Sequence, residues 1–139
     1  MAKYIKPTLD TKFHIDFHWW QKKGQNLNIQ LRSQACPECQ EQLNTGELFD
    51  WVNPETGEVF QLDRLWHCIH TECSQKVDFI DDHTPLTTAI FRIFIANNNK
   101  PMSSVEIFEK LQRKSADTIL RTIGGRVVYQ GIRPFVTAI

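Results

Sequence analysis

The chain has 139 residues, of which 41% are hydrophobic and 23% are charged, a composition that excludes an intrinsically disordered protein. No apolar stretch is long enough to cross a bilayer and no signal segment opens the chain, so we expect a cytoplasmic protein with no membrane partner. The formal net charge is zero, but residues 1–84 carry 8 Lys/Arg against 13 Asp/Glu, whereas residues 85–139 carry 8 against 3. This asymmetry predicts two modules, the second of which is better suited to phosphates.

The first 35 residues contain two segments whose patterns leave helix and strand open. Residues 12–20 alternate between apolar and polar, which indicates a half-buried strand, but Trp20 breaks the alternation. A short helix that begins near Asp16 fits this segment almost as well, and residues 25–34 are ambiguous in the same way. We expect residues 1–35 to form an arm that packs on the next module, because its aromatic side chains need an apolar surface to cover them.

A β-hairpin is predicted in the middle of the chain. Two apolar, β-prone runs occupy residues 48–52 and 59–66. The segment between them, NPETGE at residues 53–58, contains Asn, Pro and Gly, which favour a hairpin loop of four to six residues.

Four cysteines flank this hairpin in the pattern C-x2-C, 28 intervening residues and C-x4-C. In a protein expected to be cytoplasmic, such cysteines are more often metal ligands than disulfide partners. Two thiolate pairs would complete the tetrahedron that Zn²⁺ accepts and would leave no position for water, which predicts a structural rather than a catalytic ion. We therefore expect one Zn²⁺ per chain, bound by Cys36, Cys39, Cys68 and Cys73.

This pattern resembles the zinc-ribbon family over residues 36–73. In that family two cysteine knuckles are joined by a β-hairpin, and Cys36-Pro-Glu-Cys39 matches the first knuckle. The second knuckle differs, because four residues instead of two separate Cys68 from Cys73. Two alternatives therefore remain open: a Cys3His site that uses the adjacent His70, and a chain without metal.

Three helices are predicted after residue 84. Thr84-Pro85 indicates the start of the first helix, and Ser103 with Glu106 forms a capping box at the start of the second. A short turn at residues 113–115 leads to the third helix, which Gly124-Gly125 should end.

Residues 126–139 are predicted to form two short strands broken at Gln130-Gly131. Three helices and a terminal hairpin resemble a winged helix-turn-helix domain over residues 84–139. The resemblance implies that the third helix enters the major groove of double-stranded DNA while the hairpin touches its backbone or minor groove. The side chains expected to contact DNA project from this helix or are basic residues near it: Arg113, Lys114, Thr118, Arg121, Thr122, Arg126 and Arg133.

The first of the three helices is apolar on two sides. One side supplies the three-helix core, and Phe91 and Ile95 lie one turn apart on the other. A helix that is apolar on two sides is normally covered on both, either by the cysteine module or by the same helix of a second subunit. We expect the second arrangement, a homodimer, because the first helix often carries that contact in the winged-helix proteins that this domain resembles.

The expected fold class is α+β, with an arm (residues 1–35), a zinc ribbon (36–83) and a winged helix-turn-helix domain (84–139). The expected function is a zinc-stabilised DNA-binding protein, either a transcriptional regulator or a transcription-associated factor. The main alternative is a protein–protein adaptor whose winged helix binds RNA polymerase or another large assembly, and an RNA-binding accessory protein is a third reading. An enzyme is not expected, because the sequence has no phosphate-binding glycine-rich loop, nucleophile elbow or pair of catalytic carboxylates.

Overall fold

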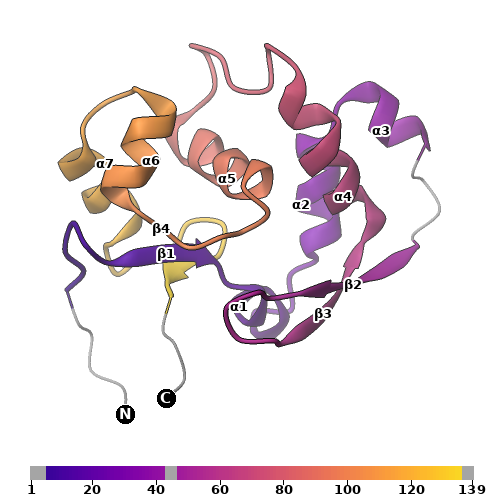
Figure 1. Ribbon diagram of the computed structural model, residues 1–139, viewed down its shortest axis with the longest axis horizontal. Coiled ribbons are helices and arrows are strands. Elements are labelled where there is room, and N and C mark those ends of the chain that lie inside the picture. Colours follow the sequence, from indigo (N-terminus) through magenta and orange to yellow (C-terminus); the bar gives the residue numbers. More distant parts are fainter. Residues whose placement is uncertain (1–5, 43–46, 136–139) are drawn as a thin grey trace. The chain divides into compact units, whose positions relative to one another are not determined.

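The computed structural model of the protein describes residues 6–42 and 47–135 and divides the chain into two units (Figure 1). One unit joins residues 6–16 to Asp82–Phe135, and among the described residues the other consists of residues 17–81. Both units contain helices and antiparallel strands, as expected for the α+β class. Among the described residues there is no helix with the length and apolarity that crossing a bilayer requires.

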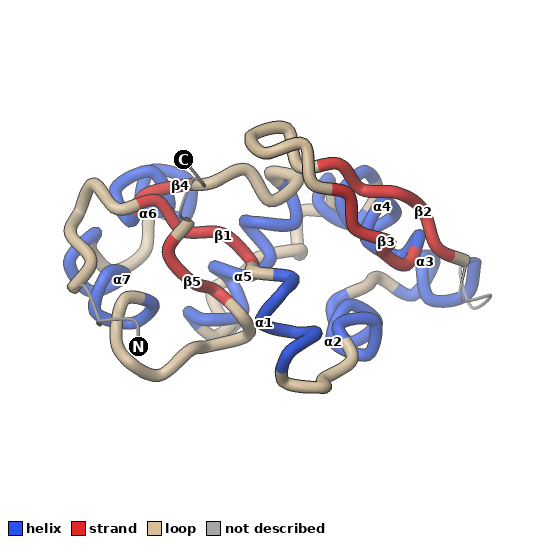
Figure 2. The backbone as a smooth tube through the Cα atoms, turned by 90° about the horizontal axis from the view of Figure 1, so that it is seen from below, coloured by secondary structure: helices blue, strands red, loops and turns tan. Residues whose placement is uncertain are grey.

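The first unit is built around a strand from the N-terminal segment, β1 (Lys12–Ile15). Strand β1 is the central strand of a three-stranded antiparallel sheet and lies between β4 (Met102–Ser103) and β5 (Ile132–Pro134), as Figure 2 shows. Its apolar residues Phe13 and Ile15 are fully buried. Strand β1 therefore completes the sheet of the unit that holds the C-terminal helices, although it precedes its partner β4 by about 90 residues in the sequence.

This position corrects the expectation that the whole arm packs on the cysteine module. The expectation is wrong for residues 6–16, which belong to the unit of the C-terminal helices. Alternation of apolar and polar residues indicates that one face of a strand is buried, but it does not indicate which distant element covers that face. The segment 12–20 forms both structures that its pattern left open, since the strand ends at Ile15 and helix α1 (Phe17–Lys22) follows.

The terminal hairpin predicted for residues 126–139 is not present in the part of the chain that the structure describes. Strand β5 is formed, but its partner is β1, and residues 136–139 lie outside the described residues. Left-handed backbone at Gln130 (φ 55°) and Gly131 (φ 75°) turns the chain into β5, where the sequence predicted a break. Residues 126–129 form no strand, and β1 thus replaces the first strand of the expected hairpin as the partner of β5.

Three helices complete this unit: α5 (Leu86–Ala96), α6 (Ser104–Leu111) and α7 (Ala116–Ile123). The capping box predicted for α6 is present. The Ser103 hydroxyl accepts the Glu106 N–H at 3.3 Å, and the Glu106 carboxylate accepts the Ser103 N–H at 3.1 Å. Helix α7 ends at the predicted glycines, and α5 begins directly after the predicted Thr84-Pro85 pair, with Pro85 at the N-cap position and no side-chain cap.

Phe91 and Ile95, which we expected to form a subunit interface, are both 0% exposed within the single chain. Helix α5 packs against strand β1, whose apolar residues are buried as well. The second apolar side of α5 is therefore covered without a second subunit. The expected interface at these two residues is wrong, and the intramolecular alternative accounts for their burial.

The second unit contains the hairpin predicted for residues 48–66. Its strands are β2 (Leu48–Val52) and β3 (Val59–Asp63), which pair in antiparallel register around the loop at residues 53–58. The second strand is shorter than predicted, because helix α4 (Arg64–Thr71) begins directly after it. The remaining elements of this unit are α1, α2 (Leu27–Gln34), α3 (Pro37–Gln42) and the 3-10 turn η1 (Cys73–Gln75).

An aromatic cluster forms the core that fixes α1 and α4 on the hairpin. The ring centroid of Phe17 lies 5.2 Å from those of Trp51 and Phe60, and 5.5 Å from that of Trp66. All three pairs meet edge to face, the arrangement that aromatic rings favour. This cluster positions α4, and with it Cys68, relative to the rest of the unit.

Candidate metal centre

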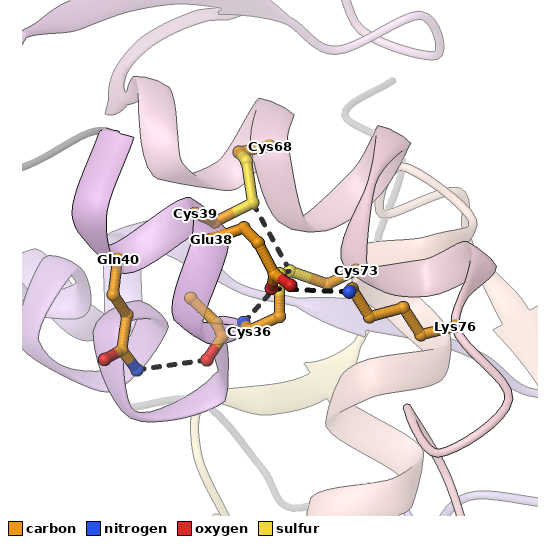
Figure 3. Close-up of polar contacts among 8 residues, drawn as sticks. Cys36, Glu38, Cys39, Gln40, Cys68, Cys73 and Lys76 are labelled. Carbon is orange, nitrogen blue, oxygen red and sulfur yellow. Dashed lines mark hydrogen bonds and ion pairs between the residues drawn. A yellow bond between two sulfur atoms is a disulfide. The ribbon is translucent and has the colours of Figure 1, made fainter.

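Helices α3 and α4 of the second unit bring the four cysteines together (Figure 3). Cys36 directly precedes α3 and Cys39 lies within it, whereas Cys68 lies within α4 and Cys73 begins η1. Helix α4 begins at Arg64 because the Asp63 carboxylate accepts the Leu65 N–H at 2.9 Å and caps the helix. The cysteines therefore lie on or beside helical segments, whereas the resemblance implied two knuckles joined by the hairpin.

Three of the sulfur atoms form a compact group. The Sγ atoms of Cys36, Cys39 and Cys73 all lie within 4.8 Å of one another. Cys73 Sγ lies 3.0 Å from Cys36 Sγ and 3.5 Å from Cys39 Sγ. Zn–S bonds of about 2.3 Å in a tetrahedral site would separate two sulfurs by about 3.8 Å, so small side-chain shifts would suffice. These three cysteines lie close enough together to hold a metal ion.

The fourth cysteine is also at this group. Cys68 is joined to Cys39 by a disulfide, with Cα atoms 6.1 Å apart. A sulfur in a disulfide is not a thiolate, and only the thiolate is a strong metal ligand. Because Cys39 belongs both to the three-sulfur group and to the disulfide, its sulfur cannot bind a metal ion as a thiolate while the disulfide is formed.

The environment of the cluster is shielded from water. Cys39 and Cys73 are 1% exposed and Cys68 is 6% exposed, whereas Cys36 is half-buried. The Cys36 N–H donates to Cys73 Sγ at 3.1 Å. Burial, together with the neighbouring Cys36 thiol, raises the pKa of the Cys73 thiol to about 11. This thiol therefore keeps its proton at neutral pH until a metal ion displaces it.

Polar contacts outside the cluster hold α3 in place. Glu38 and Lys76 form an ion pair of 3.3 Å between α3 and the residue after η1 (Figure 3). The backbone N–H of Glu38 and the Lys76 ammonium lower the pKa of the Glu38 carboxyl, and Glu38 raises the pKa of Lys76. Gln40 donates to the carbonyl oxygens of Arg32 and Ala35, which connects α3 to the end of α2.

The histidines beside the second cysteine pair have other surroundings. Within residues 6–42 and 47–135, no histidine nitrogen joins the three-sulfur group. His70, the alternative ligand, is half-buried, and its backbone carbonyl accepts the Ser74 hydroxyl. His67 is exposed, and its ring lies edge-on to Phe49 at 6.2 Å. The geometry therefore favours a sulfur-only ligand set.

The residues predicted to contact DNA divide into two groups in the first unit. Lys114, Arg121 and Arg126 are exposed, and Thr118 and Thr122 are half-buried on α7. The buried residues of α7 are Ile119 and Ile123.

The other two predicted DNA contacts, Arg113 and Arg133, bind residues in separate segments of the unit. The Arg113 guanidinium donates to the Thr84 carbonyl oxygen at 2.8 Å and so links the turn before α7 to the segment before α5. Arg133 forms an ion pair with Asp16 at 3.4 Å, from β5 to the end of the β1 segment. Their intramolecular contacts explain why a basic residue at each position serves the fold, which the charge pattern alone could not reveal.

A cavity of about 340 Å³, which the sequence did not predict, lies between α1, the turn that leads to α2, and β3. No motif marks it, because its walls come from three segments and hold no charged side chain. The apolar lining consists of Phe17, Trp20, Leu27, Phe60 and Leu62. The polar lining consists of the carboxamides of Gln21, Gln25, Asn26, Asn28 and Gln61.

Comparison of the chain with protein-family models, with curated proteins and with solved structures finds no match.

Proposed function

We propose that this chain is a zinc-stabilised DNA-binding protein. The metal assignment is supported by the chemistry of the donors, since the four side chains that meet at α3 and α4 offer only sulfur. Zn²⁺ accepts four thiolates in a tetrahedron, and a closed set of this kind holds structure and leaves no position for a substrate. The ion would be bound by Cys36, Cys39, Cys68 and Cys73 and would connect α3 to α4.

The helix pair α6–α7 is the observation that carries the DNA-binding part of the proposal. A short turn at residues 112–115 joins the helices, and Ser115 caps α7 by accepting the Thr118 N–H at 3.1 Å. Ile119 and Ile123 are buried, which leaves Arg121 on the exposed side. Helix-turn-helix proteins place the second helix of such a pair in the major groove, where an arginine can bind the edge of a guanine.

The charge and the topology of the first unit also support DNA binding by the exposed side of α7. The first unit, residues 6–16 and 82–135, has 10 Lys/Arg against 6 Asp/Glu, whereas residues 17–81 have 5 against 10. We place the first unit in a winged helix-turn-helix arrangement in which β1 substitutes for one wing strand. Because β5 and β1 are short, this arrangement relies on α7 and not on a long wing.

A second candidate is the protein–protein adaptor, which another observation favours. Val127 and Tyr129, between α7 and β5, are 64% and 43% exposed. Single exposed apolar residues are ordinary, but two at alternate positions beside the exposed helix would suit a protein partner such as RNA polymerase. The intramolecular contacts of Arg113 and Arg133 also leave fewer cations for phosphates.

Binding to duplex DNA, measured by fluorescence anisotropy at several salt concentrations, tests the proposal. A phosphate-driven complex should weaken steeply between about 50 and 200 mM salt, with a linear dependence of log affinity on log salt. Elemental analysis of the same preparation should give one zinc per chain. Zinc without any duplex binding at low salt would refute DNA binding and favour the adaptor. In that case Val127→Ser with Tyr129→Ser should abolish capture of the polymerase.

A further inference from the structure

The cysteine cluster contains two cross-links that exclude each other. One is the sulfur group of Cys36, Cys39 and Cys73, which is close enough to bind a metal ion, and the other is the Cys39–Cys68 disulfide. Both connect the α3 region to the α4–η1 region (Figure 3). The shared residue Cys39 can serve only one of them at a time.

We propose that the cluster is a peroxide-responsive switch, in which oxidation replaces the zinc ion with the Cys39–Cys68 disulfide. This inference rests on the zinc part of the proposed function. It adds a regulatory role to a site that would otherwise only hold structure, and it specifies one of the possible disulfide pairings.

Exposure of the sulfurs determines where the oxidant reacts. Cys36 is half-buried, whereas the other three cysteines are 1% to 6% exposed. Hydrogen peroxide therefore meets Cys36 first. The thiolate attacks one peroxide oxygen, an S–O bond forms, the O–O bond breaks, and hydroxide leaves with the electron pair. The product is a sulfenic acid on Cys36.

A relay of thiol–disulfide exchanges then carries the oxidation inward. Cys73 Sγ, 3.0 Å from Cys36 Sγ, attacks the sulfenic sulfur, forms an S–S bond and expels hydroxide. Cys39 Sγ, 3.5 Å from Cys73 Sγ, attacks Cys73 and releases the Cys36 thiolate. Cys68 attacks Cys39 in turn and releases the Cys73 thiolate, so that the Cys39–Cys68 bond is the end point.

The sequence of steps is balanced. Two thiolates, one hydrogen peroxide and two protons give one disulfide and two water molecules, and the two electrons come from Cys39 and Cys68. Cys36 and Cys73 return to the thiol state. Two thiols are too few to complete a structural zinc site, so the ion is released.

Oxidation and chelation should therefore have different consequences. The disulfide joins the same two helices as the metal, and it encloses the 28 residues between Cys39 and Cys68, which include the hairpin. A cross-link that closes this loop restricts the unfolded chain whether it is a metal or a disulfide. The oxidised, zinc-free chain should stay folded, whereas the reduced, chelated chain has neither cross-link.

The experiment uses the full reduced chain with its zinc content measured first. Hydrogen peroxide is added in stoichiometric steps, with a chromogenic chelator to follow free zinc and peptide mass spectrometry to map disulfides. We expect release of one zinc per chain, loss of two free thiols, a Cys39–Cys68 disulfide and an unchanged far-ultraviolet circular dichroism spectrum. Dithiothreitol with added zinc should restore the starting state, and dimedone should trap the sulfenic acid on Cys36.

Other outcomes separate this inference from the zinc assignment. Zinc retained under peroxide, or released with disulfides inside the pairs Cys36–Cys39 and Cys68–Cys73, would overturn the switch and leave structural zinc intact. Dimedone adducts on Cys39 or Cys68 in place of Cys36 would overturn the relay. A reduced chain that binds no zinc would overturn both the zinc assignment and the switch.

Discussion

The side-chain amide of Asn99 binds both backbone groups of Ile15, 84 residues away in the sequence. Asn99 Oδ1 accepts the Ile15 N–H at 2.7 Å, and Asn99 Nδ2 donates to the Ile15 carbonyl oxygen at 2.9 Å. Asn99 is buried and its backbone is left-handed (φ 62°), a conformation that asparagine tolerates better than most residues. One side chain thus holds the end of β1 on the turn that follows α5.

Replacement of Asn99 by alanine should destabilise the first unit strongly. It would leave the Ile15 N–H and carbonyl oxygen without partners in a buried place, which costs about 2–4 kcal/mol. Asn98→Ala is the matched control, because Asn98 also has a left-handed backbone (φ 55°) but is exposed. Urea denaturation should therefore show that Asn99→Ala lowers the free energy of unfolding by about 2–4 kcal/mol more than Asn98→Ala does. Equal losses for the two variants would show that the amide does not fix β1.

The elements that could be predicted from the sequence are those whose signals are local. The loop at residues 53–58 has turn residues between two β-prone runs, and it does connect β2 to β3. Ser103 and Glu106 cap α6 as predicted, because a capping box lies within four residues. The spacing of the cysteines predicted that they share one site, and all four lie together in the second unit.

The features that could not be predicted depend on distant partners or on competing local signals. The alternation that marks β1 fits a strand beside any apolar surface, so the sequence did not reveal that β1 pairs with β4 and β5. The predicted terminal hairpin fails for the same reason. Residues 64–66 were assigned to a strand because of their β-prone neighbours, although Asp63 is an N-cap and a helix follows it.

Replacement of one ligand should remove the zinc, whereas replacement of a neighbouring histidine should not. Cys73→Ser loses a buried sulfur at the centre of the cluster, and under reducing conditions we expect it to bind less than stoichiometric zinc and to unfold residues 36–73. Structural zinc supplies about 10–16 kcal/mol of apparent binding free energy in small zinc-dependent peptides, so its loss should be decisive. His70→Ala is the control and should retain the metal. Elemental analysis checks both, and zinc loss in His70→Ala alone would identify a Cys3His site.

Acid should weaken the first unit partly through Glu106. The Lys12 ammonium and the Ser103 N–H lower the pKa of the Glu106 carboxyl below its ordinary 4.5. The folded state therefore favours the carboxylate, and the stabilisation is complete above pH 4.5 and is lost as the pH falls through the folded pKa. Lys12 and Glu106 are about half exposed, so the effect should stay below about 1 kcal/mol.

Glu106→Gln tests this expectation, because glutamine keeps a capping oxygen but does not titrate. Urea denaturation at pH values on both sides of 4.5 should show a flatter acid dependence for this variant than for the parent chain. Glu109→Gln, at an exposed position of the same helix, is the control. The expectation fails if the two variants lose stability in acid to the same extent.

Arg121→Ala should weaken duplex binding if α7 reads DNA. Loss of a bidentate contact to a base costs about 1–3 kcal/mol and should relax the sequence preference. Arg32→Ala removes the same charge from an exposed position on α2, in the acidic unit, and should leave binding unchanged. Anisotropy titrations of both variants against the parent check this. Unchanged affinity of Arg121→Ala would show that α7 is not the reading helix.

Deletion of residues 1–16 should unfold the C-terminal helices even though it removes none of them. In the described part of the chain, β4 and β5 pair with β1 and not with each other, so without β1 the sheet has no remaining ladder. Helix α5 would also lose the strand that packs against it, and Phe91 and Ile95, which are buried in the full chain, should then become exposed. We expect the truncated chain to bind a hydrophobic dye and to lose its cooperative unfolding transition.

Addition of β1 as a separate peptide distinguishes a missing strand from a general loss of stability. A peptide of residues 6–16 should restore the transition, because the ladder with β4 and β5 needs no covalent connection. The matched control peptide carries Phe13→Asp and Ile15→Asp, which would place charges at two fully buried positions, and it should not restore folding. A truncated chain that sediments as a folded dimer would return Phe91 and Ile95 to the role of a subunit interface. A truncated chain that stays monomeric and unfolds like the parent would show that β1 is dispensable.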